Sequence, residues 1–344
     1  MVFFKADRRQ LSIPAFFVVL GFTAISLSHC DQRKPAAGQE ADIPVELAEI
    51  NAAIRHAPDD PDNYVRRAEY HSKNSNPGDA IDDMARAMAL DSTNAAYHHV
   101  LADIYLQSLR SQLAIATMER AAMLFPDSIN TLLKLAELHL IVRQHDRMSA
   151  ILRQVLTLQP QNTDALFMLG LMYREQGELD RAIQSFRMIV EIDSEDAEAW
   201  TMLGNLLDEK GDPTALQCFE NAIDIDPEYP QAWHSKAFYL QNRDRIPEAI
   251  EIYKHIHEID SSYTDAWLNR GILYLELDSL DQASGCFKTV VRLDSMSVTA
   301  LYYLGVTAQK QGNIDQARRH FSEALQMDPL SSRIKESLAE LDDQ

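Results

Sequence analysis

Bulky apolar and small residues recur along most of this chain at a spacing of 34 positions. The fourth position of each unit is bulky and apolar or aromatic, except at His98, and the eighth position is always Ala or Gly. A repeat of this length indicates an array of similar structural units rather than one central core. The units begin at Pro61, Ala95, Ile129, Thr163, Ala197, Pro230, Thr264 and Val298, and the last ends near Ser331.

Each unit contains two blocks of apolar residues at helical spacing, which predict two helices. Turn signals such as Gly177, Gly211 and Gly312 separate the blocks. Prolines mark the end of the second helix in four of the units, at Pro126, Pro160, Pro227 and Pro329. The sequence therefore predicts a series of helix-turn-helix pairs.

This pattern resembles the tetratricopeptide repeat. The resemblance implies an all-α fold, a right-handed superhelical solenoid of helix-turn-helix repeats. A sustained heptad is absent from the sequence, which argues against a coiled coil. An unpaired helix is expected at 45–60, and a capping helix with a short tail at 332–344. The eight expected repeats are 61–94, 95–128, 129–162, 163–196, 197–229, 230–263, 264–297 and 298–331.

The N-terminus differs from the repeats and has the pattern of an export signal. Lys5, Arg8 and Arg9 precede an uncharged, largely apolar stretch that ends at Cys30. Leu27-Ser28-His29-Cys30 resembles the lipobox of bacterial lipoproteins, which implies a signal peptide over 1–29, lipid attachment at Cys30 and a flexible tether over 30–44. His29 departs from the usual small residue, so an uncleaved signal anchor in the inner membrane remains an alternative. Both interpretations place the repeats in the cell envelope, facing the periplasm or the outer surface.

Charge and composition narrow the classes of partner and of chemistry. The 344-residue chain has 52 acidic and 32 basic residues, a net charge of -20, which disfavours nucleic acid and anionic membrane surfaces. Its three cysteines exclude a disulfide scaffold. No pair of histidines or cysteines has metal-ligand spacing, and His255 and His257 diverge on a helix. We therefore expect no cofactor, no metal, no small-molecule substrate and no enzymatic activity.

In tetratricopeptide proteins, positions 2, 5, 9, 12 and 13 of the first helices commonly contact the ligand. Positions 5 and 9 become largely apolar towards the C-terminus, while acidic residues stand in the N-terminal repeats. The resemblance therefore implies a groove that binds a segment of a partner protein. We expect this segment to be basic, or to combine basic and apolar residues. An equally open interpretation is that several of these residues pack between repeats. The implied groove comprises Leu133, Phe167, Leu171, Asn205, His234, Phe238, Leu268, Ile272, Tyr302 and Val306, and its acidic part Glu69, Asp103 and Glu137.

These observations favour a non-catalytic scaffold or adaptor of the bacterial cell envelope, for example in the assembly of an outer-membrane, pilus or secretion complex. Two alternatives stay open. One is the substrate-recognition subunit of a separate envelope enzyme, and the other is a self-assembling structural protein.

Overall fold

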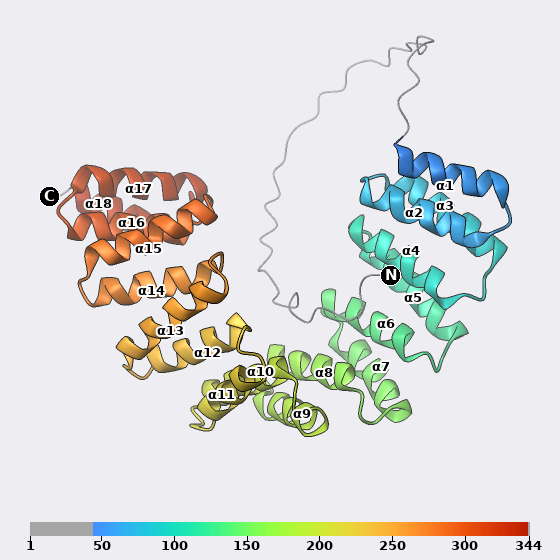
Figure 1. Ribbon diagram of the computed structural model, residues 1–344, viewed down its shortest axis with the longest axis horizontal. Helices are drawn as coiled ribbons and strands as arrows, with labels where there is room; N and C mark the ends of the chain where they lie inside the picture. Colours follow the sequence, from blue (N-terminus) through green and yellow to red (C-terminus); the bar gives the residue numbers. More distant parts are fainter. Residues whose placement is uncertain (1–43, 343–344) are drawn as a thin grey trace, which may run out of the picture. The chain divides into compact units, whose positions relative to one another are not determined.

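The computed structural model describes residues 44–342 of the chain, and these residues form α-helices and no strand (Figure 1). The predicted all-α fold is confirmed. The helices are α1 (Val45–His56), α2 (Pro61–Lys73), α3 (Pro77–Leu90), α4 (Ala95–Gln107), α5 (Ser111–Leu124), α6 (Ile129–Ile141), α7 (His145–Leu158), α8 (Thr163–Glu175), α9 (Leu179–Ile192), α10 (Ala197–Glu209), α11 (Ala215–Ile225), α12 (Pro230–Gln241), α13 (Ile246–Ile259), α14 (Thr264–Glu276), α15 (Leu280–Leu293), α16 (Val298–Lys310), α17 (Ile314–Met327) and α18 (Ser332–Asp342).

Helices α2 to α17 form antiparallel pairs in which each helix packs against the next along the chain (Figure 1). We call the first helix of a pair the A helix and the second the B helix. Every A helix begins at the first residue of a repeat, from Pro61 in α2 to Val298 in α16. The expected signal peptide at 1–29, the lipid-attachment residue Cys30 and residues 31–43 of the tether lie outside the described residues.

The helices divide into two compact units, which we call the N-terminal unit, described from residue 44 to Asn162, and the C-terminal unit, which begins at Thr163. Within each unit, an A helix contacts its own B helix, and that B helix contacts the next A helix. Neighbouring A helices also touch, for example α10 and α12. This nearest-neighbour packing is what an array of short repeats needs in order to bury its apolar faces.

The turn from each A helix to its B helix has one residue in the left-handed region of backbone conformation, always at the fifteenth position of the unit. Glycine adopts this conformation at no steric cost, whereas other residues are strained there. Leu109 is the one apolar member, and its side chain is 92% exposed. The eight residues are Ser75, Leu109, Arg143, Gly177, Gly211, Asp244, Asp278 and Gly312.

Tryptophans at the fourth position connect three of the A helices, α10, α12 and α14, to the loops before them. The indole N–H of Trp200 donates to the carbonyl of Ser194 at 3.0 Å, and Trp233 and Trp267 make the same bond to the residue six positions earlier. His98 occupies this position in the second repeat and is 2% exposed, and neither ring nitrogen has a hydrogen-bond partner among the described residues.

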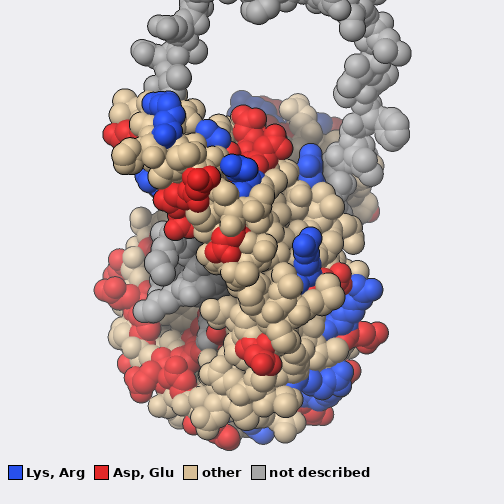
Figure 2. Space-filling view, turned by 90° about the vertical axis from the view of Figure 1, so that its right-hand side faces the viewer, with Lys and Arg blue, Asp and Glu red and all other residues tan. Residues whose placement is uncertain are grey.

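Charge is spread unevenly over the described surface. On the side drawn in Figure 2, a broad, mostly uncharged area occupies the middle, and acidic and basic side chains lie beside one another near its edges. Within residues 44–342, none of the helices has the length and apolar character that crossing a bilayer requires.

Candidate functional site

A cleft of about 690 Å³ lies on the A-helix face of the C-terminal unit, between α10 and α12. Helix α10 contributes the residues at positions 9, 12 and 13 of its repeat, and α12 and the turn after it contribute positions 9, 13 and 14 of the next. The lining residues are Asn205, Asp208, Glu209, Phe238, Asn242 and Arg243.

Phe238 is the apolar element of this cleft. Its side chain is 45% exposed although it projects from a helix whose next two residues, Tyr239 and Leu240, are buried. Asn205 holds the equivalent position on α10 and is also exposed. The sequence predicted both as groove residues, and the structure brings them to one cleft. An exposed aromatic ring beside a side-chain amide is a surface suited to binding rather than to core packing.

Arg243 fixes one end of the cleft by joining the two A helices. Its guanidinium donates to the carboxylate of Asp208 at 2.8 Å and to the carbonyl of Tyr239 at 3.2 Å, and it lies 3.5 Å from the centre of the Tyr239 ring. This contact neutralises Asp208 and leaves the exposed Glu209 as the carboxylate that faces solvent. One end of the cleft is therefore held in place by Arg243, and Glu209 supplies an exposed negative charge.

The predicted groove was drawn from positions 5 and 9 of the repeats and therefore lacks four residues of the cleft: Asp208, Glu209, Asn242 and Arg243. Positions 12 and 13 were already among those implied by the resemblance, and they identify Asp208, Glu209 and Asn242. Arg243, at position 14, carried no such signal because its role depends on the neighbouring helix.

The structure does not expose every residue of the predicted groove. Phe167 and Leu171 are 3% and 8% exposed, and the Phe167 ring packs edge-on against Phe186 at 5.2 Å. Their place in a binding strip is therefore corrected: they belong to the interior, because α8 turns these positions towards its neighbours. Leu133, Leu268 and Ile272 are half-buried.

Tyr302 and Val306 also pack inwards. Both lie against the apolar cluster that closes the last repeat. The guanidinium of Arg333, on α18, covers the Tyr302 ring at 4.1 Å. The alternative that these positions pack between helices therefore describes the C-terminal end better than an open apolar strip.

His234 does not line this cleft, and its imidazole contacts one side-chain amide and two tyrosine rings. Its Nε2 lies 3.0 Å from the side-chain amide of Asn269, and its ring lies beside those of Tyr253 and Tyr263. Burial lowers the pKa of His234, so the imidazole is neutral at pH 7.

The predicted acidic residues of the N-terminal unit differ in their surroundings. Glu69 is exposed. Asp103 and Glu137 both approach the buried ammonium of Lys134, at 2.5 and 3.6 Å. Burial raises the pKa of Glu137 despite this lysine. Lys134 therefore cancels part of the negative charge that the sequence indicated on this face.

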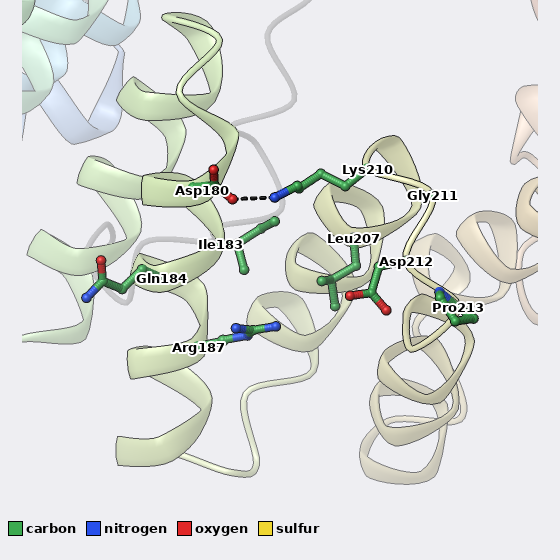
Figure 3. A pocket seen from close by; sticks show the side chains of 9 residues that line it. All are labelled: Asp180, Ile183, Gln184, Arg187, Leu207, Lys210, Gly211, Asp212 and Pro213. Atoms are coloured by element: carbon green, nitrogen blue, oxygen red, sulfur yellow. Dashed lines mark hydrogen bonds and ion pairs between the residues drawn. The ribbon is translucent and has the colours of Figure 1, made fainter.

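A second cavity, of about 490 Å³, lies between α9 and the end of α10 (Figure 3). Asp180 on α9 forms an ion pair with Lys210 across it. Hydrogen bonds from the hydroxyl and the amide of Thr214 lower the pKa of Asp212, so this carboxylate stays ionised.

Within residues 44–342, no group of three or more histidine, cysteine or acidic residues is arranged to hold a metal ion. His255 and His257 lie against different tryptophans, Trp233 and Trp267, consistent with their divergence on the helix. Cys218 and Cys286 are free and buried.

Family models of the tetratricopeptide repeat match residues 133–197, 197–229, 218–251 and 298–331. These are repeat families, and no enzyme family is among them. A comparison with curated proteins gives no match.

Solved structures resemble this chain at low sequence identity. The APC/C hetero-tetramer Cut9-Hcn1 has a TM-score of 0.56 and 14% identity, over 86% of this chain and 58% of that chain. MamA has a TM-score of 0.43 and 20% identity, over 50% of this chain and 94% of that chain. YrrB, described as a TPR protein with an unusual peptide-binding site, has a TM-score of 0.42 and 24% identity, over 55% and 98%. With the matched repeat models, the observed helix pairs identify this chain as an all-α solenoid that contains tetratricopeptide repeats.

Proposed function

We propose that this protein is a non-catalytic scaffold that binds a segment of a partner protein in the cleft between α10 and α12. The observation that carries the proposal is the exposed ring of Phe238 in a cleft that two repeats build together. Exposed aromatic side chains in partly enclosed sites are frequent anchors of protein interfaces.

The polar lining of the cleft suits an extended peptide. The amides of Asn205 and Asn242 each offer a donor and an acceptor, which match the N–H and carbonyl groups of a peptide backbone. Glu209 attracts a basic side chain, and Phe238 packs against an apolar one. These features support a partner segment of mixed basic and apolar character.

The sequence also supports a place in the cell envelope. The signal pattern that ends at Cys30 favours export and a lipid anchor, with a signal anchor as the alternative. An exported, membrane-held scaffold is suited to the assembly of an outer-membrane, pilus or secretion complex. Cys30→Ser is expected to abolish incorporation of labelled fatty acid, and unchanged labelling would rule out lipid attachment at this residue.

The cleft is tested by site-specific photocrosslinking in the native host. A photoreactive amino acid at position 238 is expected to crosslink to a partner that one at Leu277 does not reach. Leu277 is a matched control because it is a 50% exposed apolar residue of the same unit that does not line the cleft.

Phe238→Glu is expected to weaken capture of that partner while helicity, measured by circular dichroism, stays unchanged. Leu277→Glu is expected to leave capture intact. Equal crosslinking at the two positions, or full capture by Phe238→Glu, would place binding elsewhere.

A further inference from the structure

The solvent-facing side of α5, in the N-terminal unit, is mostly apolar. Leu113, Met123 and Leu124 are 46%, 76% and 52% exposed. At 3.6 residues per turn, these side chains fall within about 100° of the helix circumference. Exposed Ala116 and Arg120 lie in the same arc. We call these five residues, Leu113, Ala116, Arg120, Met123 and Leu124, the α5 stripe.

The other B helices show that this stripe is unusual for the array. Six of the other seven carry a carboxylate in the first turn, where it favours the helix dipole. Helix α5 has Leu113 there and no acidic residue. The acidic residue further along α5, Glu119, is paired with Arg147 of α7 at 3.2 Å.

Leu109 extends the stripe by one more apolar side chain. It lies in the turn before α5 with φ of 58° and is 92% exposed. The seven equivalent turn residues are glycine, serine, arginine or aspartate. A leucine here is strained by its backbone and gains nothing from packing, so the fold of the unit does not account for it.

The charge around the stripe differs from that of the whole chain. Residues 109–158 contain six basic and four acidic residues, one of the basic ones the buried Lys134, in a protein of net charge -20. Helix α7 lies beside α5, as the Arg147–Glu119 pair and the bond from Gln154 to the carbonyl of Pro126 show. Exposed Arg147, Arg153 and the 43% exposed Leu158 continue the mixed basic and apolar surface. The global acidity therefore does not describe this part of the surface.

We infer that the α5 stripe and Leu109 rest on a lipid membrane, with the aliphatic side chains among the acyl chains and the arginines at the phosphates. Separate protruding apolar side chains interspersed with arginine suit an interfacial membrane contact. Arginine adds attraction to anionic lipid headgroups.

The inference rests on the proposed anchoring of the N-terminus in a membrane. Residues 30–44 span at most about 50 Å when fully extended. They end at α1, in the same unit as α5. An anchored chain therefore presents the N-terminal unit to the bilayer at a high effective concentration, so that a weak contact suffices.

The test uses the full chain reconstituted in vesicles of phosphatidylethanolamine and phosphatidylglycerol. A photoreactive amino acid replaces Met123 in one sample and Met296 in the other. Met296 is the matched control, since it is a 67% exposed methionine of the C-terminal unit. Mass spectrometry is expected to find phospholipid adducts at position 123 and not at 296. The inference would be overturned if phospholipid adducts formed at neither site or equally at both. It would also be overturned if position 123 formed adducts only to protein, including a second copy of this chain.

A second measurement separates membrane contact from a structural role. Leu109→Gly is expected to raise the Tm while lowering the yield of lipid adducts at position 123. Leu113→Asp is expected to lower that yield about tenfold, because a carboxylate does not enter the acyl-chain region as the leucine side chain does. Unchanged yields in both variants would contradict the inference.

Lipid attachment at Cys30 is decided independently. An uncleaved signal would also hold the chain to the vesicle, so the adduct pattern does not depend on whether Cys30 is acylated. If Cys30→Ser loses fatty-acid labelling and no lipid adducts form at position 123, the lipid anchor is supported and the membrane contact of the α5 stripe is rejected. If lipid adducts form at position 123 but the protein incorporates no labelled fatty acid, the membrane contact of the α5 stripe is supported and lipid attachment at Cys30 is rejected.

Discussion

The backbone of Gly271 in α14 lies so close to the ring of Phe287 in α15 that no side chain fits between them. A Cβ atom on Gly271 would be 2.6 Å from Cε1 of Phe287, and that ring is fully buried. Gly170, Gly204 and Gly305 meet Phe186, Phe219 and Phe321 in the same way. Repeats with alanine at the eighth position have Met84, Met118, Leu152 or Tyr253 at the twenty-fourth. Seven of the eight repeats thus pair glycine with phenylalanine or alanine with a smaller side chain, and Ala237 with Tyr253 is the exception.

Gly271→Ala is expected to destabilise the protein by about 1–3 kcal/mol, because the added methyl group forces the Phe287 ring or the helices apart. Urea unfolding followed by circular dichroism measures the change in free energy of unfolding. Gly285→Ala on α15 is the control, since its Cβ would meet nothing within 4 Å. That variant should gain about 0.5–1 kcal/mol from helix propensity.

The double variant Gly271→Ala with Phe287→Met reproduces the residue pair found in the first two repeats. It should recover part of the stability that Gly271→Ala loses, since the smaller, flexible side chain leaves room for the methyl group. Strictly additive losses would show that the two residues do not share one space.

The left-handed turn residues give a pair of opposite predictions. Leu109→Gly should raise the free energy of unfolding by about 0.5–1 kcal/mol, because glycine removes the strain at φ of 58°. Gly177→Ala, at φ of 74° in the equivalent turn, should lower it by about 1 kcal/mol. Urea unfolding of the two single variants checks both signs, and a loss of stability in Leu109→Gly would mean that the leucine packs usefully.

Lys134→Met is expected to cost about 2 kcal/mol at pH 7, because it leaves the carboxylates of Asp103 and Glu137 without their shared cation. Burial already raises the pKa of Glu137, so this carboxylate takes up a proton as the pH is lowered from 7, and the loss should shrink. Lys210→Met removes the exposed pair with Asp180 and should cost less than about 1 kcal/mol. A loss at Lys134 that does not vary with pH would argue against this electrostatic explanation.

His257 should make the protein less stable in acid. Its imidazole stacks on Trp267 at 3.7 Å, and burial lowers its pKa to about 4. The unfolded chain binds this proton near pH 6.5, so stability is lost as the pH falls from about 6.5 towards 4. His257→Gln should flatten the pH dependence of the unfolding midpoint between these values, whereas His255→Gln, beside the exposed Glu258, should not. An identical pH profile for wild type and His257→Gln would refute this assignment.

The amino-acid sequence by itself determined the helix pairs of this protein. Local signals suffice for that: apolar spacing sets the helices, and the fifteenth-position turn and the prolines end them. The small eighth residue of every repeat is a feature of the sequence, and the close contact of Gly271 with Phe287 shows why a small residue is needed there.

Only the tertiary structure decided which side chains remain available. Position 9 holds buried Leu171, exposed Phe238 and inward-packed Val306 on equivalent helices. Exposure at such a position depends on what the neighbouring helices place over it, as Arg333 does at Tyr302. Periodicity within one repeat carries no information about that neighbour. For the same reason the sequence indicated free acidic charge at Asp103 and Glu137, whereas the folded chain places the Lys134 ammonium beside both carboxylates.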